Sequence, residues 1–227
     1  MMLAKLSHVT KRYGKTEGVH DLSLELYPGQ AVGLLGLNGS GKTTTLKLLA
    51  GMLFPTAGRV EVLGKNPREN RGQIAYLSDA DNLYAWMTPS DAERFMRGLY
   101  PDFNPTRYRE LLAFLEVPKQ GYRSMSRGQR ARLRLAMVLA REARLFLLDE
   151  PLSGIDVISR DRILKSLVLE WREEACLVLS THEVSEAEGI FERVVLLKEG
   201  RLALDAQAED LRAKGQSVKD AFIEVLA

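Results

Sequence analysis

The chain has 227 residues, of which 45% are hydrophobic and 27% are charged, and its formal net charge is +2. This length and composition are typical of one large α/β domain, or of a domain with a subdomain, and they argue against a disordered chain. The near balance of charge gives no reason to expect a nucleic-acid or acidic partner. The sequence has neither the apolar core of a signal peptide nor the run of about 18 apolar residues of a membrane span, so we expect another protein to supply any membrane segment.

The N-terminal residues 3–35 are predicted to form β-strands. Leu22, Leu24 and Leu26 alternate with polar or amphipathic residues, which is the pattern of a strand with one buried face. The apolar run 31–35 lacks this alternation and indicates a strand that is buried on both faces. We therefore expect a small antiparallel β layer that leads into a core strand.

The sequence directly after this core strand, Gly36 to Thr43, reads GLNGSGKT and matches every fixed position of the phosphate-binding loop. In this motif the glycines bring backbone N–H groups against a polyphosphate, Lys42 reaches the β- and γ-phosphates, and the Thr43 hydroxyl binds Mg²⁺. The helical residues 44–49 complete the strand, loop and helix that the motif requires. The candidate nucleotide-binding residues of the loop are Asn38, Gly39, Ser40, Gly41, Lys42, Thr43 and Thr44.

Two short strands and a helical segment are predicted next. Residues 59–63 and 74–77 have the apolar character of strands. Helices are expected to begin at Thr88 and at Asn104, because each is a good N-cap residue followed by proline. We interpret residues 80–125 as a helical insertion in an α/β core; the alternative is that these helices simply pack on the sheet.

Two carboxylates follow a further predicted core strand. The apolar run 145–148 ends at Asp149 and Glu150, and the carboxyl ends of strands are where ligands bind in open α/β sheets. Phosphoryl transfer to water requires a charge clamp, a metal and an oriented nucleophile. We expect Asp149 to join Thr43 at the metal and Glu150 to polarise the attacking water, because neighbouring strand residues point in opposite directions.

The C-terminal third continues the same pattern. The strand 177–179 follows the lone Cys176 and leads to His182, which we expect to contact the γ-phosphate or the water. A histidine after a strand is by itself more often structural. The cysteine cannot form an internal disulfide and is expected to be buried, as in proteins of the reducing cytosol. A helix is predicted over 126–141, a hairpin over 193–204, and a helical tail after it.

These motifs, in this order and spacing, resemble the ATP-binding cassette, the nucleotide-binding subunit of ABC transporters. The segment 125–129, Met-Ser-Arg-Gly-Gln, resembles the cassette signature, and 153–156, Ser-Gly-Ile-Asp, resembles its dimer-contact loop. The resemblance covers nearly the whole chain. It implies a single ABC ATPase domain over 1–227, with a P-loop NTPase core of mixed parallel sheet, an N-terminal antiparallel β layer and a helical subdomain inserted at about 80–140.

The resemblance also implies roles for particular residues. Tyr13 is the adenine-stacking residue, although by itself it is only a tyrosine at the end of a strand. Lys42 and Thr43 hold phosphate and magnesium, Glu150 is the catalytic carboxylate, and His182 is the switch histidine. The implied ligands are ATP and Mg²⁺.

The signature implies a dimer. Ser126 and the backbone near Gly128 are predicted at a helix N-terminus, whose positive end favours an anion. In the family that anion is the γ-phosphate bound by the other subunit, so two head-to-tail cassettes enclose two ATP molecules and part after hydrolysis. The nearby Arg130 and Arg134 share one helical face, for which we expect a solvated or intersubunit role and not nucleic-acid binding.

The sequence departs from the family pattern in two places. The signature has Met125 where leucine is usual and Arg127 where glycine is usual, whereas the phosphate-contacting residues remain. After the strand 74–77, Asp79 replaces the family's glutamine, which meets the metal and borders the membrane subunit. We expect Asp79 to touch Mg²⁺ through water, or Asp81 to take part in its place.

Three functions remain open at this stage. The first is a transporter ATPase at the cytoplasmic face of the membrane, a homodimer or heterodimer whose segment 79–86 and helical insertion dock on a separate permease. The short C-terminus and the segment 76–79 resemble small bacterial exporters. The second is a soluble ABC-type ATPase acting on nucleic acid or ribosomes, although such relatives usually carry long coiled coils or tandem cassettes. The third is a P-loop kinase, in which Glu150 and His182 would lack a purpose.

Overall fold

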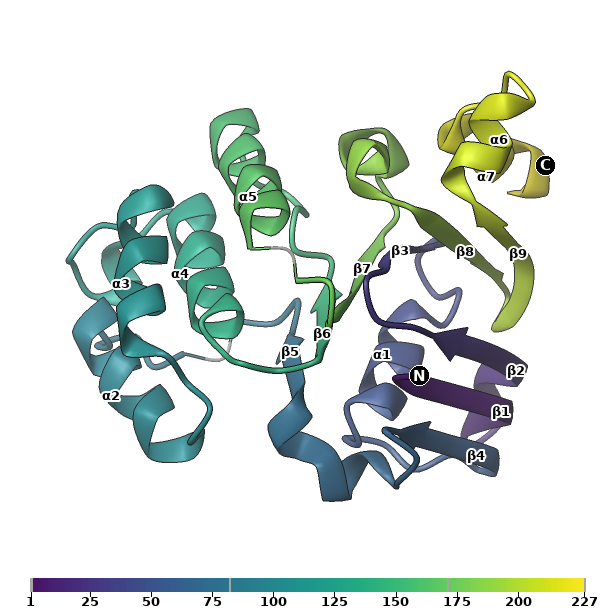
Figure 1. Ribbon diagram of the computed structural model, residues 1–227, viewed down its shortest axis with the longest axis horizontal. Coiled ribbons are helices and arrows are strands. Elements are labelled where there is room, and N and C mark those ends of the chain that lie inside the picture. The colour runs from purple at the N-terminus through teal and green to yellow at the C-terminus, as the bar shows by residue number, and fades with distance from the viewer. Residues whose placement is uncertain (1, 82, 171, 227) are drawn as a thin grey trace.

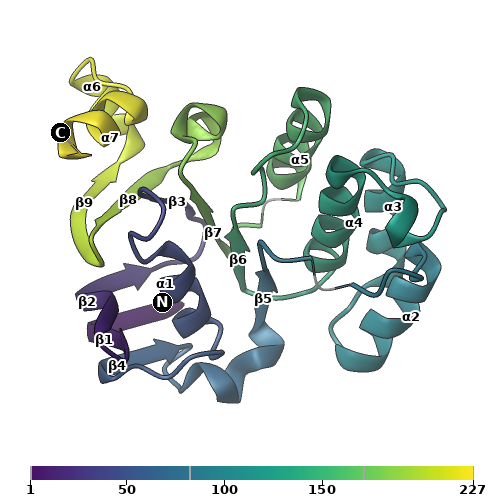
Figure 2. The same cartoon turned by 180° about the vertical axis from the view of Figure 1, so that it is seen from behind.

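The computed structural model describes residues 2–81, 83–170 and 172–226. Within these residues the strands form one sheet of three and one sheet of six. Figures 1 and 2 show the small sheet beside helix α1 (Lys42–Leu49) toward one end of the molecule. The helices α2 (Pro89–Leu99), α3 (Pro105–Phe114) and α4 (Arg127–Leu139) lie at the other end, and the strands β5 (Ile74–Leu77) and β6 (Leu145–Asp149) of the large sheet lie between. Helix α1, which follows the predicted phosphate loop, therefore lies apart from the helices α2 to α4.

The small sheet is the predicted N-terminal antiparallel layer. Strand β1 (Ala4–Tyr13) lies between β2 (Thr16–Leu26) and β4 (Ala57–Val62) and is antiparallel to both. The alternating leucines of β2 are buried, as their pattern predicts. Strand β4 begins before the predicted range 59–63, at Ala57, and it ends at Val62 because Leu63 adopts a left-handed backbone with a φ of 50°.

The large sheet has the order β5-β6-β7-β3-β8-β9. Its first five strands are parallel, and β9 pairs antiparallel with β8 as the predicted hairpin. The strands are β3 (Ala31–Leu35), β5 (Ile74–Leu77), β6 (Leu145–Asp149), β7 (Cys176–Thr181), β8 (Arg193–Lys198) and β9 (Arg201–Gln207). Because β6, β7 and β3 are neighbours, the residues that follow them meet at one edge of the sheet.

Helix α1 packs between the two sheets. Its residues Leu46, Leu48 and Leu49 are buried in one cluster with Leu6 of β1 and Val32 of β3. Burial of a leucine side chain contributes about 1.5–3 kcal/mol. This apolar packing fixes the helix, and with it the loop before the helix, against both sheets.

The predicted helix starts are confirmed by their caps. Helix α2 (Pro89–Leu99) begins after Thr88 with a complete capping box, and α3 (Pro105–Phe114) begins after Asn104. Helix α4 (Arg127–Leu139) is capped by Ser126 and ends two residues before the predicted end. The other helices are α5 (Val157–Leu169), α6 (Ala208–Ala213) and α7 (Val218–Leu226), with short 3₁₀ turns at Pro67–Gln73, Tyr122–Ser124, Val184–Glu186 and Glu188–Ile190.

The helices α2, α3 and α4 form the helical subdomain (Figure 1). Met96, Leu111 and Leu133, one from each helix, belong to the same buried cluster as Phe146 of β6. The subdomain is thus a separate group of helices that shares its core with one face of the large sheet. We keep about 80–140 as its proposed extent.

Two sequence expectations concern burial. Cys176 is fully buried, as predicted, and this burial raises the pKa of its thiol to about 12. Within the parts of the chain that the structure describes, no helix combines the length and the hydropathy needed to cross a membrane.

Candidate nucleotide-binding site

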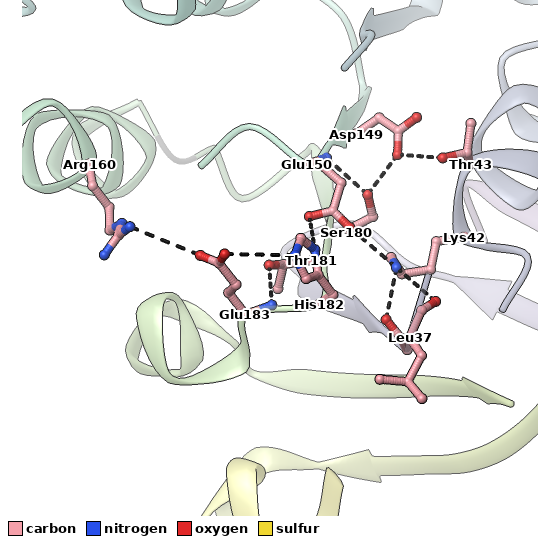
Figure 3. A network of polar contacts seen from close by, with 11 residues as sticks. Leu37, Lys42, Thr43, Asp149, Glu150, Arg160, Ser180, Thr181, His182 and Glu183 are labelled. Atoms are coloured by element: carbon pink, nitrogen blue, oxygen red, sulfur yellow. Dashed lines mark hydrogen bonds and ion pairs between the residues drawn. The ribbon is translucent and has the colours of Figure 1, made fainter. Parts of the chain in front are cut away.

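The phosphate loop connects β3 to α1. Gly41, the residue before α1, has a φ of 102°, and a Cβ there would lie 2.5 Å from the Gly18 carbonyl oxygen. Only glycine fits this position without strain. Lys42 is buried, and its Nζ donates to the carbonyl oxygens of Gly36, at 2.8 Å, and Leu37, at 3.3 Å (Figure 3). The lysine is therefore held against the loop itself.

The loop also carries a polar group that needs a ligand. The Ser40 hydroxyl is buried, with the residue 6% exposed, and has no hydrogen-bond partner among the described residues. A buried hydroxyl without a partner costs free energy. Asn38 and Gly39 are exposed, and the loop leads into the N-terminus of α1, where an anion is favoured. The loop is suited to a phosphate group.

Asp149 ends β6 and is 1% exposed. Its Oδ1 accepts hydrogen bonds from the Thr43 hydroxyl at 3.1 Å and from the Ser180 hydroxyl at 2.8 Å (Figure 3). Its Oδ2 accepts from the Tyr76 hydroxyl at 3.2 Å. Burial and the Asp149 carboxylate raise the pKa of Tyr76, so the tyrosine keeps the proton that it donates. The predicted pairing of Thr43 with Asp149 is present.

Glu150 contacts different groups from its neighbour. Its Oε1 lies 3.2 Å from Lys42 Nζ, and its Oε2 lies 2.9 Å from His182 Nδ1. The sequence argument for different partners assumed a continuing strand, and this assumption is wrong: β6 ends at Asp149, and Glu150 has a left-handed φ of 48°. The Glu150 N–H donates to the Ser180 hydroxyl at 3.0 Å, which stabilises this turn.

His182 follows β7 and lies between two carboxylates. Besides Glu150, its Nε2 faces Glu183 Oε1 at 3.7 Å (Figure 3). The Thr181 hydroxyl accepts a hydrogen bond from the Glu183 N–H at 2.9 Å, which orders the backbone after the strand. The structure thus brings together Lys42, Glu150 and His182, as the sequence predicts.

Tyr13 lies beside the helix that follows the loop. Its hydroxyl is 3.4 Å from Thr44 Oγ1, and a Cβ on Gly18 would lie 2.8 Å from the Tyr13 ring. The residue is 47% exposed, so the ring is accessible to a ligand. This position, at the side of α1, is compatible with stacking on a base whose phosphates occupy the loop.

The signature segment lies elsewhere in the same chain. Ser126 Oγ accepts from the Gln129 N–H at 3.2 Å and caps α4. A Cβ on Gly128 would lie 2.5 Å from Ser159 Oγ and 2.7 Å from Asp156 Oδ2, so the start of α4 packs closely on the start of α5. Figure 1 places α4 across β5 and β6 from α1. One chain therefore does not bring its own signature to its own phosphate loop.

The structure accommodates both residues of the signature that depart from the family pattern, Met125 and Arg127. Met125 is buried in the core that includes the helical subdomain, as an apolar residue of similar size to leucine would be. The Arg127 guanidinium lies over Gly154, whose φ is 61° and whose missing Cβ leaves room for it. The arginine thus connects the signature to the loop 153–156.

The arginines of α4 are not simply solvated, and their alternative intersubunit role stays a prediction. Asp81 accepts hydrogen bonds from Tyr122, at 2.6 Å, and from Arg130, at 3.1 Å, and it lies 3.7 Å from Arg134. Arg134 also lies within hydrogen-bond distance of three backbone carbonyl oxygens, those of residues 78–80. These arginines therefore have partners within the chain.

The contacts of Asp79 and Asp81 concern their predicted role at the metal. Asp81 is held by the tyrosine and the arginines, and among the described contacts none joins it to Thr43 or Asp149, so its alternative role as a metal partner stays a prediction. Asp79 is exposed, and only its backbone carbonyl has a described contact, the one with Arg134. Its expected contact with Mg²⁺ stays a prediction.

The oxygens of Thr43 and Asp149 are suitable ligands for Mg²⁺. In phosphate sites this ion uses one or two protein oxygens together with phosphate oxygens and water, and the Thr43 hydroxyl and Asp149 carboxylate supply such a pair. Sequence reasoning gave no role to two residues of this site, Ser180 and Tyr76. The parallel register places Asp149 opposite Ser180, but that register is not visible in the sequence.

Comparisons with known proteins agree with this geometry. A family profile described as "ABC transporter" matches residues 19–153. The uncharacterized ABC transporter ATP-binding protein YxlF of Bacillus subtilis strain 168 is 30% identical, over 95% of this chain and 74% of that protein. The SkfA peptide export ATP-binding protein SkfE of the same organism is 32% identical, over 90% of this chain and 89% of that protein.

The relatives and solved structures extend this similarity. The Fe(3+) ions import ATP-binding protein FbpC of Brucella melitensis is 34% identical, over 90% of this chain and 61% of that protein. A solved ATP-binding subunit of an ABC transporter has a TM-score of 0.86 at 24% identity, covering 99% of this chain and all of that chain. A dimeric ATP-binding cassette bound to ADP and Pi has a TM-score of 0.80 at 24% identity, covering 90% and 98% of the two chains.

Proposed function

Because the chain belongs to the ABC transporter family, as one of its ATP-binding and ATP-hydrolysing subunits, we propose that it works as a head-to-tail dimer that drives a separate permease. The observation that carries the proposal is the separation of two phosphate-binding elements in one chain. The loop before α1 holds Lys42, whereas Ser126 caps α4 on the far side of β5 and β6. A second subunit is needed to complete the site.

The dimer is supported by the accessibility of both elements. Ser126 is exposed at the tip of α4, and Asn38 and Gly39 are exposed at the loop. The similar cassette solved with ADP and Pi is a dimer. In our proposal each ATP is bound by the loop of one subunit and by Ser126 and Gly128 of the other, with the adenine stacked on Tyr13.

The proposed chemistry assigns one task to each group at the sheet edge. Lys42 binds the β- and γ-phosphates, and Thr43 and Asp149 hold Mg²⁺. The bound ion supplies positive charge that offsets the charge of the phosphates. Glu150 accepts a proton from the attacking water, and His182, hydrogen-bonded to Glu150 at 2.9 Å, keeps that carboxylate in position.

A groove beside the helical subdomain is our candidate permease site. It has a volume of about 400 Å³ and is lined by apolar and basic side chains, including Met52, Phe95, Leu99, Arg134 and Arg141. Phe95 is 41% and Leu99 54% exposed. Exposed apolar surface of this kind marks interaction sites.

An exposed aromatic pair follows the strand that borders this groove. Tyr84 and Trp86 stack with their ring centroids 5.8 Å apart and are 62% and 66% exposed. They belong to the predicted docking segment 79–86, of which residue 82 lies outside the described residues. We propose that a cytoplasmic helix of the permease covers the groove and this pair, which would place the protein at the cytoplasmic face of the membrane.

The direction that we propose is export, as in the peptide export protein SkfE that the chain resembles. The import proteins among the relatives make uptake the competing outcome. Transport by the purified complex in vesicles decides between the two directions.

Co-purification tests the partner. We expect the tagged chain to retain a polytopic membrane protein and the Trp86→Cys variant to crosslink to it. The Glu110→Cys variant, at an exposed position on α3, should not crosslink. Retention on ribosomes or DNA without any membrane protein would contradict the proposal and favour the soluble ATPase. Phosphate transfer to an acceptor without ATP hydrolysis would favour a kinase.

A further inference from the structure

Tyr76 makes a contact that the known chemistry of the site does not explain. It lies on β5, the edge strand of the large sheet, and its hydroxyl donates to Asp149 Oδ2 at 3.2 Å. Strand β5 pairs in parallel with β6, which places Tyr76 opposite Leu147, two residues before the aspartate. The phenol therefore reaches along the sheet edge to the carboxylate.

The hydrogen bonds of Asp149 limit where a metal can bind. A carboxylate offers about four lone-pair positions. Two are used on Oδ1, by Thr43 and Ser180, and one on Oδ2, by Tyr76. The contacts of the described residues therefore leave one lone pair of Oδ2 free. The direction of this lone pair depends on where the Tyr76 hydroxyl binds the same oxygen.

We propose that Tyr76 is a positioning residue for the magnesium site: its hydroxyl fixes the Asp149 carboxylate so that the remaining lone pair of Oδ2 points to the metal or to a metal-bound water. This inference rests on the proposed role of Asp149 at Mg²⁺. Groups that hydrogen-bond to metal ligands orient them, and their loss typically lowers metal affinity or activity by about 10- to 100-fold.

The position of Tyr76 gives this contact a second consequence. Its side chain also lines the groove that we propose for the permease. The same residue thus touches the candidate docking surface with one part and the candidate metal ligand with its hydroxyl. Tyr76 therefore lies between the proposed docking surface and the proposed metal ligand.

The variant Tyr76→Phe removes the hydroxyl and keeps the ring. ADP binding is measured by calorimetry with Mg²⁺ and in excess chelator, and the Mg²⁺ dependence of ATP hydrolysis is measured in parallel. We expect the half-saturating Mg²⁺ concentration to rise about tenfold, and ADP to bind more weakly with Mg²⁺ but unchanged in chelator. Tyr108→Phe is the control, because it removes a buried phenol hydroxyl that donates to the Pro89 carbonyl oxygen, in the helical subdomain.

The outcomes separate this inference from the proposed function. If the unmodified protein binds ADP equally with and without Mg²⁺ and hydrolyses no ATP, the proposed metal site itself is refuted. If the unmodified protein needs Mg²⁺ but Tyr76→Phe has the same Mg²⁺ dependence, only the positioning role is refuted. An equal loss of ADP affinity with and without Mg²⁺ would also refute it, because a general structural effect does not distinguish the two conditions.

Discussion

Replacement of Glu150 by glutamine tests the central geometry of the site. The ammonium group of a lysine has three N–H donors. In this structure Lys42 Nζ contacts the Gly36 and Leu37 carbonyl oxygens and lies 3.2 Å from Glu150 Oε1. An incoming phosphate must displace one of these contacts, and it also meets the negative charge of the glutamate.

The size of the effect follows from the ion pair. Two unit charges 3.2 Å apart attract with about 5 kcal/mol at an effective dielectric constant of 20. The neutral glutamine keeps a dipolar contact with Lys42 and loses part of that attraction. If a quarter of it is lost, the lysine becomes available to phosphate at a gain of about 1.3 kcal/mol, or about ninefold in Kd.

We therefore expect Glu150→Gln to bind ATP about tenfold more tightly and to hydrolyse it about 10²- to 10⁴-fold more slowly, since it cannot accept the proton of the water. Calorimetry gives the Kd, phosphate release gives the turnover, and size-exclusion chromatography with ATP should show an accumulated dimer. Glu110→Gln is the control, because Glu110 is an exposed carboxylate on α3. A monomeric Glu150→Gln protein that hydrolyses ATP at the normal rate would refute this reasoning.

Three further predictions concern single groups. Lys42→Ala should weaken nucleotide binding by about 10- to 100-fold, because a hydrogen bond to a charged group contributes about 1.5–3 kcal/mol. An unchanged Kd in calorimetry would contradict this. Lys47→Ala, on the same helix, is the control. Asp79→Gln should preserve or raise ATP hydrolysis if Asp79 occupies the metal-side position where the family has glutamine, and Arg134 holds only the backbone carbonyl of this residue. Complete inactivation would indicate a specialised role for the aspartate. Burial raises the pKa of the Cys176 thiol to about 12, so the thiol should be neutral at pH 8. It should react with a thiol reagent only after the protein is unfolded in guanidinium. Rapid labelling of the native protein would mean that β7 opens readily.

Local patterns were sufficient for most of the elements. Thr88 and Asn104 mark helix starts in the sequence, because a capping side chain bonds to the backbone two or three residues away. The phosphate loop was recognised for the same reason, since its function depends on the backbone of eight consecutive residues. The expected pairing of Thr43 with Asp149 followed from the position of the aspartate at the end of a core strand and from the need of phosphoryl transfer for a metal, and it is present.

The predictions that failed depended on contacts between distant segments. Asp81 and Arg130 are 49 residues apart, and their hydrogen bond depends on how the segment after β5 packs on α4. No periodicity in the sequence encodes that packing. The left-handed backbone of Glu150 was missed likewise, because it is stabilised by the hydroxyl of Ser180 from the next strand.

The sequence by itself determined that this chain has a phosphate loop, two carboxylates after a core strand and a helix that begins near Ser126, because each is a short motif whose chemistry is local. The tertiary structure decided which groups share one site. The parallel order of β5, β6, β7 and β3 brings Tyr76, Asp149 and Ser180 together beside the loop. It also places α4, which Ser126 caps, on the other side of β5 and β6 from α1, because the order of the strands in the sheet sets the spacing of the helices that pack on it.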